Sequence, residues 1–376
     1  MRSQIFSSLV FFCSALALPA NAQLSFTGLG DLVGGSFESR AFGVSSDGSV
    51  IVGRSNSGNG NEAMRWVGGL MTPLGTFAGG SFPSAALGVS GDGSVTVGAA
   101  SPGSGSQGFR LVGGTMTSLG SSTSNAVGVS SDGNTVTGNG NFGSGSEAFR
   151  WTSVGGITRL GDLSGGGFYS VSSAISADGS TVVGISEVSG GTHAFRWNSG
   201  VMTSLGDFSG GSVLSEAYGV SADGSVVVGY GNSSSGTEAF RWTAGGLVSL
   251  GDLPGGSISS YATGVSGDGN IVIGSGTSGS GREAFLWTQA GGIQNLKDFL
   301  IAGGATGLTD WTLTDAYAIS NDGTTVVGWG TNPSGNTEAF RTVIASTSAP
   351  EPGTLTLLGL GALIVVCRRQ GLLRRL

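Results

Sequence analysis

The chain has 376 residues, of which 74 are Gly, only 8 are Pro and 38% are hydrophobic. This composition is too apolar for a disordered chain and too rich in Gly for a helical one, so it favours many short strands joined by tight turns. Residues 23–349 contain 11 Arg and Lys against 22 Asp and Glu, a net charge of −11 that argues against nucleic acid and anionic surfaces as partners.

The N-terminal segment predicts export. Arg2 precedes an apolar run from Ile5 to Leu18, and the small residues Ala20 and Ala22 follow it. This order is typical of a secretory signal peptide, so we expect signal peptidase to remove residues 1–22. An uncleaved membrane anchor is the alternative, although the run is short for one. Both cysteines lie in the terminal segments, which excludes disulfides and thiolate metal sites from the exported domain.

One unit of about 45 residues occurs seven times between residues 23 and 345. Successive Asp-Gly pairs are 45, 40, 46, 45, 45 and 54 residues apart, which is inside or near the range of propeller blades. The aspartates of these pairs are Asp47, Asp92, Asp132, Asp178, Asp223, Asp268 and Asp322. Each unit has four apolar segments separated by turn signals, so we expect four strands per unit.

The fifth unit shows the expected order of strands. Its first strand, Ala217 to Ser221, consists mostly of small residues and suits the innermost position, where blades crowd a central axis. Asp223-Gly224 predicts a two-residue hairpin into the second strand. The third strand carries Phe240 and Trp242, which we expect to pack between blades, and a Gly-Gly turn leads to the fourth.

The two ends of the repeat region predict how the ring closes. The last unit stops after Glu338 to Ala345 with three strands, and the segment Gln23 to Leu29 supplies a fourth. We therefore expect an all-β fold, a seven-bladed β-propeller closed by its N-terminal strand. An open β-solenoid is the competing interpretation, but its terminal units would be capped rather than split. Extra residues in the longest spacing predict a short helix with Leu296, Phe299 and Leu300 on one side.

Alternation of strand direction predicts two different faces. The Asp-Gly and Gly-Gly turns lie on one face, and the Gly/Ser loops and the connections between blades lie on the other. The changes in repeat length occur in the connections, so the second face is the expected interaction face.

The repeated charged and aromatic residues have a structural interpretation. The seven aspartates are candidate calcium ligands, since calcium prefers carboxylate oxygens, but each turn offers a single carboxylate. We interpret them as turn residues that bond their own backbone, and predict no metal and no cofactor. Glu and Arg of the repeated Glu-Ala-Phe-Arg sequence point to opposite sides of one strand, so we expect contacts with neighbouring blades or strands. Trp311 and Trp329 lie outside the repeated Trp position and are candidates for exposed binding contacts.

The repeat resembles the extracellular HAF repeat family, whose triplet is present at His193-Ala194-Phe195. The other units have Glu-Ala-Phe, Glu-Ala-Met or Gln-Gly-Phe at this place, beginning at Glu62, Gln107, Glu147, Glu238, Glu283 and Glu338. The resemblance spans nearly all of residues 23–345. It implies a secreted or surface protein and no known reaction.

The C-terminal segment, residues 346–376, breaks sharply from the repeats. Pro350-Glu351-Pro352 is followed by an apolar run from Thr354 to Cys367 and then by Arg368 and Arg369. This order is similar to the PEP-CTERM sorting tail of Gram-negative bacteria, which implies processing by an exosortase and delivery to the cell surface or exopolysaccharide. The apolar run predicts a short transmembrane helix that holds the chain at the membrane before processing, with the Arg cluster on the cytoplasmic side. An ordinary C-terminal membrane anchor is the alternative, although the run is short for one.

These features favour a noncatalytic exported protein of the cell envelope, cell surface or extracellular matrix, structural or adhesive and associated with exopolysaccharide. The first alternative is a glycan-binding module that uses the variable face, with calcium as an optional aid. The second is a propeller hydrolase or lyase, for which acids present in single blades should converge at one end of the channel. The acids that meet this description are Glu187, Glu216, Asp310 and Asp315.

Overall fold

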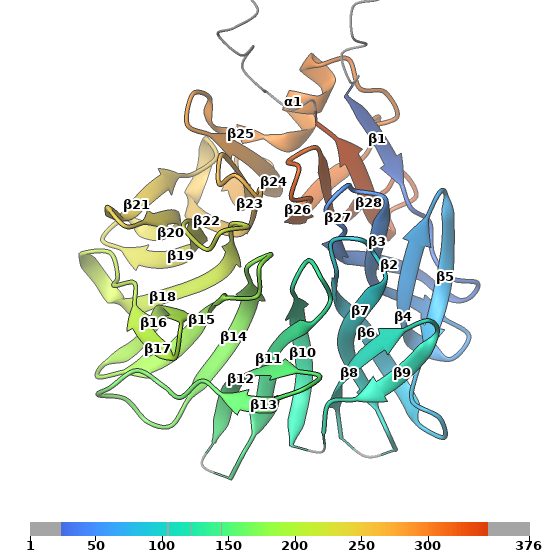
Figure 1. Cartoon of the computed structure of the whole chain (residues 1–376). Helices are drawn as coiled ribbons and strands as arrows, with labels where there is room; N and C mark the ends of the chain where they lie inside the picture. The colour runs from blue at the N-terminus through green and yellow to red at the C-terminus, as the bar shows by residue number, and fades with distance from the viewer. Residues whose placement is uncertain (1–23, 104, 121, 144, 345–376) are drawn as a thin grey trace, which may run out of the picture. The chain divides into compact units, whose positions relative to one another are not determined.

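The computed structural model describes residues 24–103, 105–120, 122–143 and 145–344. These residues form 28 β-strands and one α-helix, and the strands make seven four-stranded antiparallel blades around a central axis (Figure 1). Contacts divide the chain into the units Met1–Ile344 and Ala345–Leu376. The predicted signal peptide and the predicted C-terminal helix lie outside the described residues. Within residues 24–344, the described helix is too short to cross a membrane.

The first six blades are each continuous in sequence. Blade 1 contains β2 (Gly34–Val44), β3 (Val50–Ser57), β4 (Gly60–Val67) and β5 (Leu70–Gly75). Blade 2 contains β6 (Ser81–Val89), β7 (Val95–Ser101), β8 (Gln107–Val112) and β9 (Thr115–Ser118). Blade 3 contains β10 (Thr123–Val129), β11 (Thr135–Asn141), β12 (Ser146–Thr152) and β13 (Gly156–Arg159).

The remaining blades follow the same order. Blade 4 contains β14 (Ser170–Ile175), β15 (Thr181–Val188), β16 (Gly191–Asn198) and β17 (Val201–Ser204). Blade 5 contains β18 (Gly210–Val220), β19 (Val227–Ser233), β20 (Gly236–Thr243) and β21 (Gly246–Gly251). Blade 6 contains β22 (Gly255–Val265), β23 (Ile271–Ser278), β24 (Gly281–Thr288) and β25 (Gly292–Asn295). Blade 7 contains β26 (Thr312–Ile319), β27 (Thr325–Thr331), β28 (Thr337–Val343) and the N-terminal β1 (Ser25–Gly28).

The N-terminal strand closes the ring as predicted. β1 pairs antiparallel with β28, with Ser25 opposite Val343 and Gly28 opposite Phe340. The closure is reinforced from blade 1, because the Ala339 amide donates to the hydroxyl of Ser39 at 2.9 Å. The two ends of the repeat region are therefore held in one sheet.

Small residues lie where the innermost strands approach one another, as predicted. A Cβ added to Gly88 would lie 3.1 Å from the Val127 carbonyl oxygen and 3.3 Å from the Cα of Gly128 in the next blade. Gly219 is equally close to Gly264. Gly permits this approach of two backbones, because an added Cβ would crowd the next blade.

The third strand of each blade makes side-chain contacts with the blades on both sides. Phe240 is fully buried and packs, with Trp242, against Val183 and Ala194 of blade 4. Arg241 points the other way and donates through Nη2 to the Gly269 carbonyl of blade 6 at 3.1 Å. Equivalent arginine contacts run from blade to following blade, ending with Arg341 to the Gly48 carbonyl of blade 1 at 3.3 Å. The repeated Arg is thus an inter-blade contact whose partner is a backbone carbonyl.

The Asp-Gly turns differ from the predicted two-residue hairpin. In blade 5, the strand pair ends at Ser221 and Val226, so four residues form the loop. The Ser221 hydroxyl accepts from the Val226 amide at 2.9 Å and donates to Asp223 at 2.7 Å, while Asp223 accepts from the Ser225 amide at 2.9 Å. The two-residue prediction is wrong because the buried serine takes the hydrogen bond that would otherwise close a tight hairpin.

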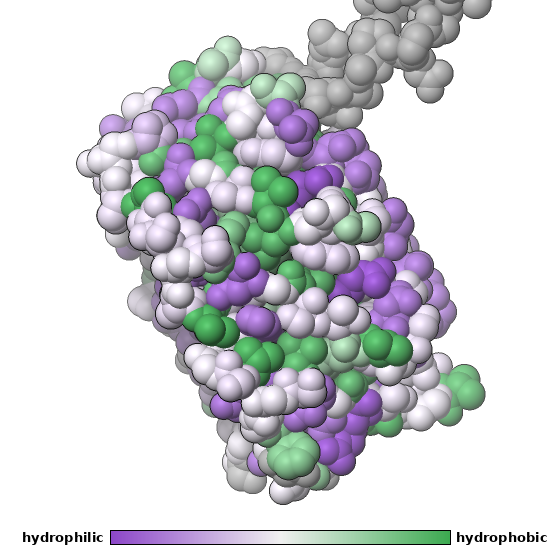
Figure 2. Space-filling model, turned by 90° about the vertical axis from the view of Figure 1, so that its left-hand side faces the viewer, coloured by the Kyte–Doolittle hydropathy of each residue, from purple (hydrophilic) through white to green (hydrophobic). Residues whose placement is uncertain are grey.

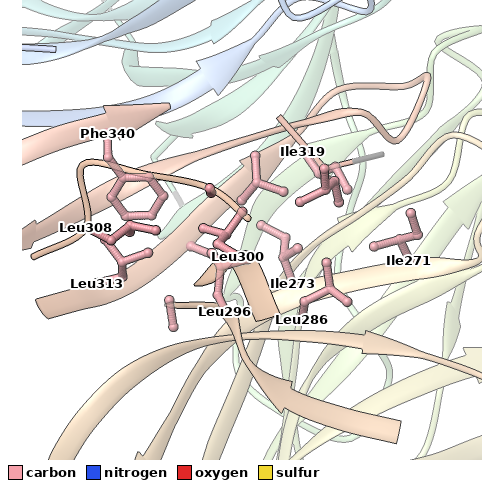
Figure 3. Close-up of a cluster of buried hydrophobic side chains, with 14 of the residues drawn as sticks. Ile271, Ile273, Leu286, Leu296, Leu300, Leu308, Leu313, Ile319 and Phe340 are labelled. Atoms are coloured by element: carbon pink, nitrogen blue, oxygen red, sulfur yellow. The ribbon is translucent and has the colours of Figure 1, made fainter. Parts of the chain in front are cut away.

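The junction of blades 6 and 7 is built differently from the others. Leu286 occupies the position of the repeated Arg and is 2% exposed. It belongs to a hydrophobic cluster that includes Leu296 and Leu300 of the helix α1 (Leu296–Ala302), as Figure 3 shows. Phe299 packs against this cluster, so the predicted helix and its apolar side are confirmed.

The outer edge of the ring is mixed in polarity. Figure 2 shows hydrophobic residues as a broken band among neutral and hydrophilic ones on the side seen at the left of Figure 1. On the outermost strands β17 and β21, Val201 and Val248 are each 62% exposed.

Candidate functional site

A cavity of about 410 Å³ lies along the central axis. Its wall is formed mainly by the innermost strand of every blade, which confirms the predicted position of the first strand. This volume falls in the range of small-molecule sites. The channel is therefore the candidate functional site of the described residues.

The end of the channel near the Asp-Gly turns is narrowed by one residue from each blade, and most of these residues are small. Each blade contributes the residue before its turn aspartate: Ser46, Gly91, Ser131, Ala177, Ala222, Gly267 and Asn321. Their backbones are linked from blade to blade, for example from the Ser46 amide to the Gly91 carbonyl at 3.0 Å. The side chains of Asn321 and Ser46 are hydrogen-bonded at 2.9 Å, and the hydroxyls of Ser46 and Ser131 are 3.5 Å apart. A cavity of about 100 Å³ remains there, so we expect ligands to enter from the opposite end.

Aliphatic side chains form the next layer of the channel. They are Val44, Val89, Val129, Ile175, Val220, Val265 and Ile319, one from each blade. This layer is alike in all blades, and it separates the constriction from the wider part of the channel.

Above this layer the wall differs from blade to blade. Blades 5, 6, 7 and 1 contribute a set of aromatic and charged residues that we call the channel-mouth arc. Its members are Glu216, Tyr218, Tyr230, Tyr261, Arg282, Asp315, Tyr317, Trp329, Glu38, Arg40, Phe42 and Arg54. The corresponding residues of blades 2, 3 and 4 are smaller and uncharged: Ala85, Leu87, Ala99, Asn125, Val127, Asn139, Val171, Ser173 and Ile185.

The aromatic members of the arc contact each other in two groups. The Phe42 ring lies 5.3 Å from Tyr317 and 5.8 Å from Trp329 between ring centroids. The Tyr230 ring lies 5.7 Å from Tyr218 and 4.7 Å from Tyr261. Phe42, Tyr218 and Tyr317 line the cavity directly, so these aromatic groups form part of its wall.

The charged members of the arc are unevenly compensated. Arg282 and Asp315 form a single pair, with Nη2 2.6 Å from Oδ1. Glu38 lies between two arginines, with its Oε1 3.2 Å from Arg40 and 3.5 Å from Arg54. The carboxylate of Glu216 accepts a hydrogen bond from the Tyr218 hydroxyl at 3.0 Å. Within the arc, blade 1 thus contributes an excess positive charge, and blade 5 contributes a negative one.

The environment keeps three tyrosines of the arc protonated, Tyr218, Tyr230 and Tyr317. Burial, and then the Glu216 carboxylate, raises the pKa of Tyr218 above the ordinary tyrosine value. Burial also raises the pKa of Tyr230, and burial with the Asp315 carboxylate raises the pKa of Tyr317. These phenols are therefore neutral hydrogen-bonding groups at physiological pH.

The two tryptophans predicted as exposed contacts have different positions. Trp311 is only 6% exposed, and its ring meets Phe26 edge-on at 5.0 Å. Its predicted exposure is wrong, because the segment after α1 folds back and places this side chain in the core beside β1. Trp329 is half-buried within the channel-mouth arc, so it remains a candidate binding residue.

The turn aspartates lie on the face opposite the arc and are used by their own turns. Hydrogen bonds from the Ser225 amide and the Ser221 hydroxyl lower the pKa of Asp223 to about 2. Similar bonds lower the pKa values of Asp47 and Asp92 to about 2. In residues 24–344 as described, no three His, Cys, Asp or Glu side chains gather into a metal-binding group.

The four acids considered for an enzyme do not converge in the described structure. Glu216 and Asp315 lie in the arc, in blades 5 and 7, and each is bound to a neighbouring side chain. Glu187 lies near the exposed end of β15, and Asp310 lies in the exposed loop before β26. The four acids therefore do not all lie at one end of the channel, as the hydrolase or lyase alternative would require.

Most of the channel-mouth arc was missed because its members are scattered through the sequence. The sequence signal that identifies such residues is a position that varies from repeat to repeat. The residue before the Gly or Ala of the innermost strand is Phe42, Leu87, Val127, Ser173, Tyr218, Thr263 or Tyr317, whereas the flanking positions hardly change. A position that varies inside a uniform unit is free of the repeated packing contacts and can be used for binding.

The predicted sorting residues lie outside the described residues but inside a family match. Residues 348–370 match the PEP-CTERM protein-sorting motif, and this range includes Pro350, Glu351, Pro352, Arg368 and Arg369. The chain carries a PEP-CTERM sorting motif. The motif implies processing by an exosortase and marks an exported, cell-surface protein of Gram-negative bacteria. Comparison with curated proteins found no match.

Solved structures show the same fold at low sequence identity. An oligogalacturonate lyase from Vibrio parahaemolyticus matches with a TM-score of 0.54 and 11% identity, over 86% of this chain and 98% of that one. The β-propeller domain of the trilobed protease from Pyrococcus furiosus matches with a TM-score of 0.51 and 11% identity, over 85% and 95%. That domain has an open velcro topology, whereas β1 closes blade 7 here.

A TolB from Acinetobacter baumannii also matches, with a TM-score of 0.48 and 13% identity. The match covers 66% of this chain and 63% of that protein.

Proposed function

We propose that this protein is a noncatalytic exported component of the cell surface or extracellular matrix, structural or adhesive and associated with exopolysaccharide. The observation that carries the proposal is the sorting motif at residues 348–370, joined to a closed propeller. The resemblance to extracellular HAF repeats supports the same location.

The noncatalytic part of the proposal rests on how the acids and bases are used. The repeated arginines bind backbone carbonyls of the next blade, and the turn aspartates bind their own turns. Of the repeated glutamates, Glu62 accepts from the Ser57 hydroxyl at 2.6 Å, and Glu147 pairs with Arg159 of its own blade. General acid–base catalysis needs an acid or base that is available to a substrate, and these groups are engaged in structural contacts.

Cell fractionation tests the proposal. The full chain is produced in a Gram-negative host that has an exosortase and an exopolysaccharide layer, and both termini are determined by mass analysis. We expect the protein in the envelope or matrix, without residues 1–22 and with its C-terminal tail processed. A matched variant with Pro350, Glu351 and Pro352 replaced by Ala should retain the tail and accumulate in the cell membrane. Recovery of the unaltered chain only from the cytosol contradicts the proposal.

Glycan binding is the second candidate function, and the channel-mouth arc favours it. Aromatic side chains beside hydrogen-bonding groups, in a cavity of about 410 Å³, are the elements of a site for a small polar ligand. Binding of matrix polysaccharide to the purified protein, lost on replacing Trp329 by Ala, would support it. Unchanged binding by this variant would place the contact elsewhere.

A further inference from the structure

We infer that the channel-mouth arc binds a sugar that carries a carboxylate, with the carboxylate on Arg40 and Arg54 and the sugar ring against Trp329 and Phe42. The inference rests on the proposed association with exopolysaccharide and names the kind of sugar that the protein would recognise. It requires a positive site, an aromatic surface and room for the ligand in one place.

The positive site is the arginine pair of blade 1. Arg40 and Arg54 are directly opposite each other on β2 and β3, and Glu38 is their shared carboxylate partner. The Nε atoms of both arginines are buried and have no hydrogen-bond partner among the described residues. Their side chains are 34% and 32% exposed, so part of each arginine is accessible to solvent. A second carboxylate would balance the charge and use guanidinium donors that Glu38 leaves free.

The aromatic surface adjoins this pair. The Arg40 guanidinium carbon lies 5.5 Å from the centre of the Trp329 ring, and Trp329 contacts both Phe42 and Tyr317. A sugar held by its carboxylate on Arg40 would therefore meet aromatic rings with its carbon skeleton. An inorganic anion would satisfy the arginines but would gain nothing from these rings.

The rest of the cavity suits hydroxyl groups rather than further negative charge. Glu216 and the hydroxyl of Tyr218 lie on the blade 5 side of the arc, and Asn125 of blade 3 and Ser173 of blade 4 line the cavity. A second carboxylate would meet the negative charge of Glu216, and a long polyanion would be repelled by the net charge of −11 on residues 23–349. The site thus selects a short saccharide, or a chain end, with its carboxylate at blade 1.

Titration calorimetry on the purified exported protein tests the inference. The probes are a galacturonic acid trimer and a galactose trimer with the same linkage. We expect the acidic trimer to bind at least about tenfold more tightly, since charge-assisted hydrogen bonds provide a difference of this size. We expect the preference to weaken as salt is raised, because the arginine pair is partly exposed.

Variants separate the charge from the aromatic surface. Arg40→Gln and Arg54→Gln should each reduce the affinity for the acidic trimer about tenfold or more, and Trp329→Ala should reduce the affinity for both trimers. Arg40→Lys, which keeps the charge and disturbs the fold least, should lose less affinity than Arg40→Gln. Arg159→Gln, which removes an arginine outside the channel, is the matched control and should bind like the unaltered protein.

Three outcomes would overturn the inference: no binding of the acidic trimer, equal affinity for the two trimers, or unchanged affinity in a folded Arg40→Gln or Arg54→Gln protein. Competition by inorganic phosphate at the same concentration as the acidic trimer would also overturn it, because the site would then recognise charge alone. These results leave the proposed function untouched, since that proposal is tested by where the chain is found and how its ends are processed.

Discussion

The turn face and the channel mouth of this propeller differ in whether their residues are repeated from blade to blade. At the turn face, all seven blades have the same serine and aspartate hydrogen bonds, and six have an arginine that binds the next turn. At the channel mouth, blades 5, 6, 7 and 1 carry aromatic and charged residues, whereas blades 2, 3 and 4 carry small or neutral ones. Each blade must make the same contacts with its neighbours, so the repeated residues stabilise the ring, and only the varied residues are available for a ligand.

The largest expected difference between the two regions is in the free energy of unfolding after replacement of one Phe in each. Phe240→Ala removes a fully buried ring between blades 4 and 5 and should lower the free energy of unfolding by about 3–5 kcal/mol. Phe42→Ala removes the same atoms from the half-buried channel wall and should cost less than half of that. Urea unfolding of both variants measures the difference. Equal losses would mean that the channel mouth is part of the core.

Removal of a turn hydroxyl should have the next largest effect. Ser221→Ala leaves the buried Val226 amide without its acceptor and removes one of the hydrogen bonds to the Asp223 carboxylate, so it should cost about 1–3 kcal/mol. Ser173→Ala, in the wall of the channel, should stay within about 0.5 kcal/mol of the unaltered protein. A comparable loss in both variants would show that the turn serines have no special role.

The contact between the repeated Arg and the next blade can be tested by giving blade 5 the Leu that blade 6 has at this position. Arg241→Leu introduces the residue that blade 6 has at Leu286, but blade 5 has no helix to cover it, so we expect a loss of about 1–2 kcal/mol. Arg159→Leu breaks an exposed ion pair within one blade and should cost less than about 1 kcal/mol. Thermal unfolding compares the two. A stable Arg241→Leu protein would mean that the inter-blade hydrogen bond contributes little.

The smallest expected effect of a single change is on the pH dependence of stability. The folded turn lowers the pKa of Asp223 to about 2 from an ordinary value of 3.8. Its stabilisation is therefore present above about pH 4 and is lost as the pH falls toward 2, when the carboxylate becomes protonated in the folded state. Melting temperatures between pH 7 and pH 2.5 should fall less steeply for Asp223→Asn than for the unaltered protein. An equal slope in the two proteins would mean that the Asp223 turn contributes nothing to the pH dependence.

Much of the fold could be predicted because a repeat displays the same physical requirement seven times. Local sequence patterns predicted that β1 completes the last blade. They also predicted the apolar side of α1. The hairpin at Asp223 was mispredicted because dipeptide preference ignores the buried hydroxyl of Ser221 two residues earlier. Trp311 was mispredicted because its burial depends on β1, which lies at the other end of the repeat region.

The sequence alone determined the seven units, their four strands, the closing N-terminal strand and the sorting motif, because each of these follows from periodicity or from a contiguous pattern. Only the tertiary structure decided which side chains meet at the channel. Trp329 reaches Phe42, and Tyr230 reaches Tyr261, because the ring places residues from different blades at one level of the wall. The reason is geometric: a strand pattern fixes which side of a blade a residue faces, but the curvature and closure of the whole ring fix its neighbour.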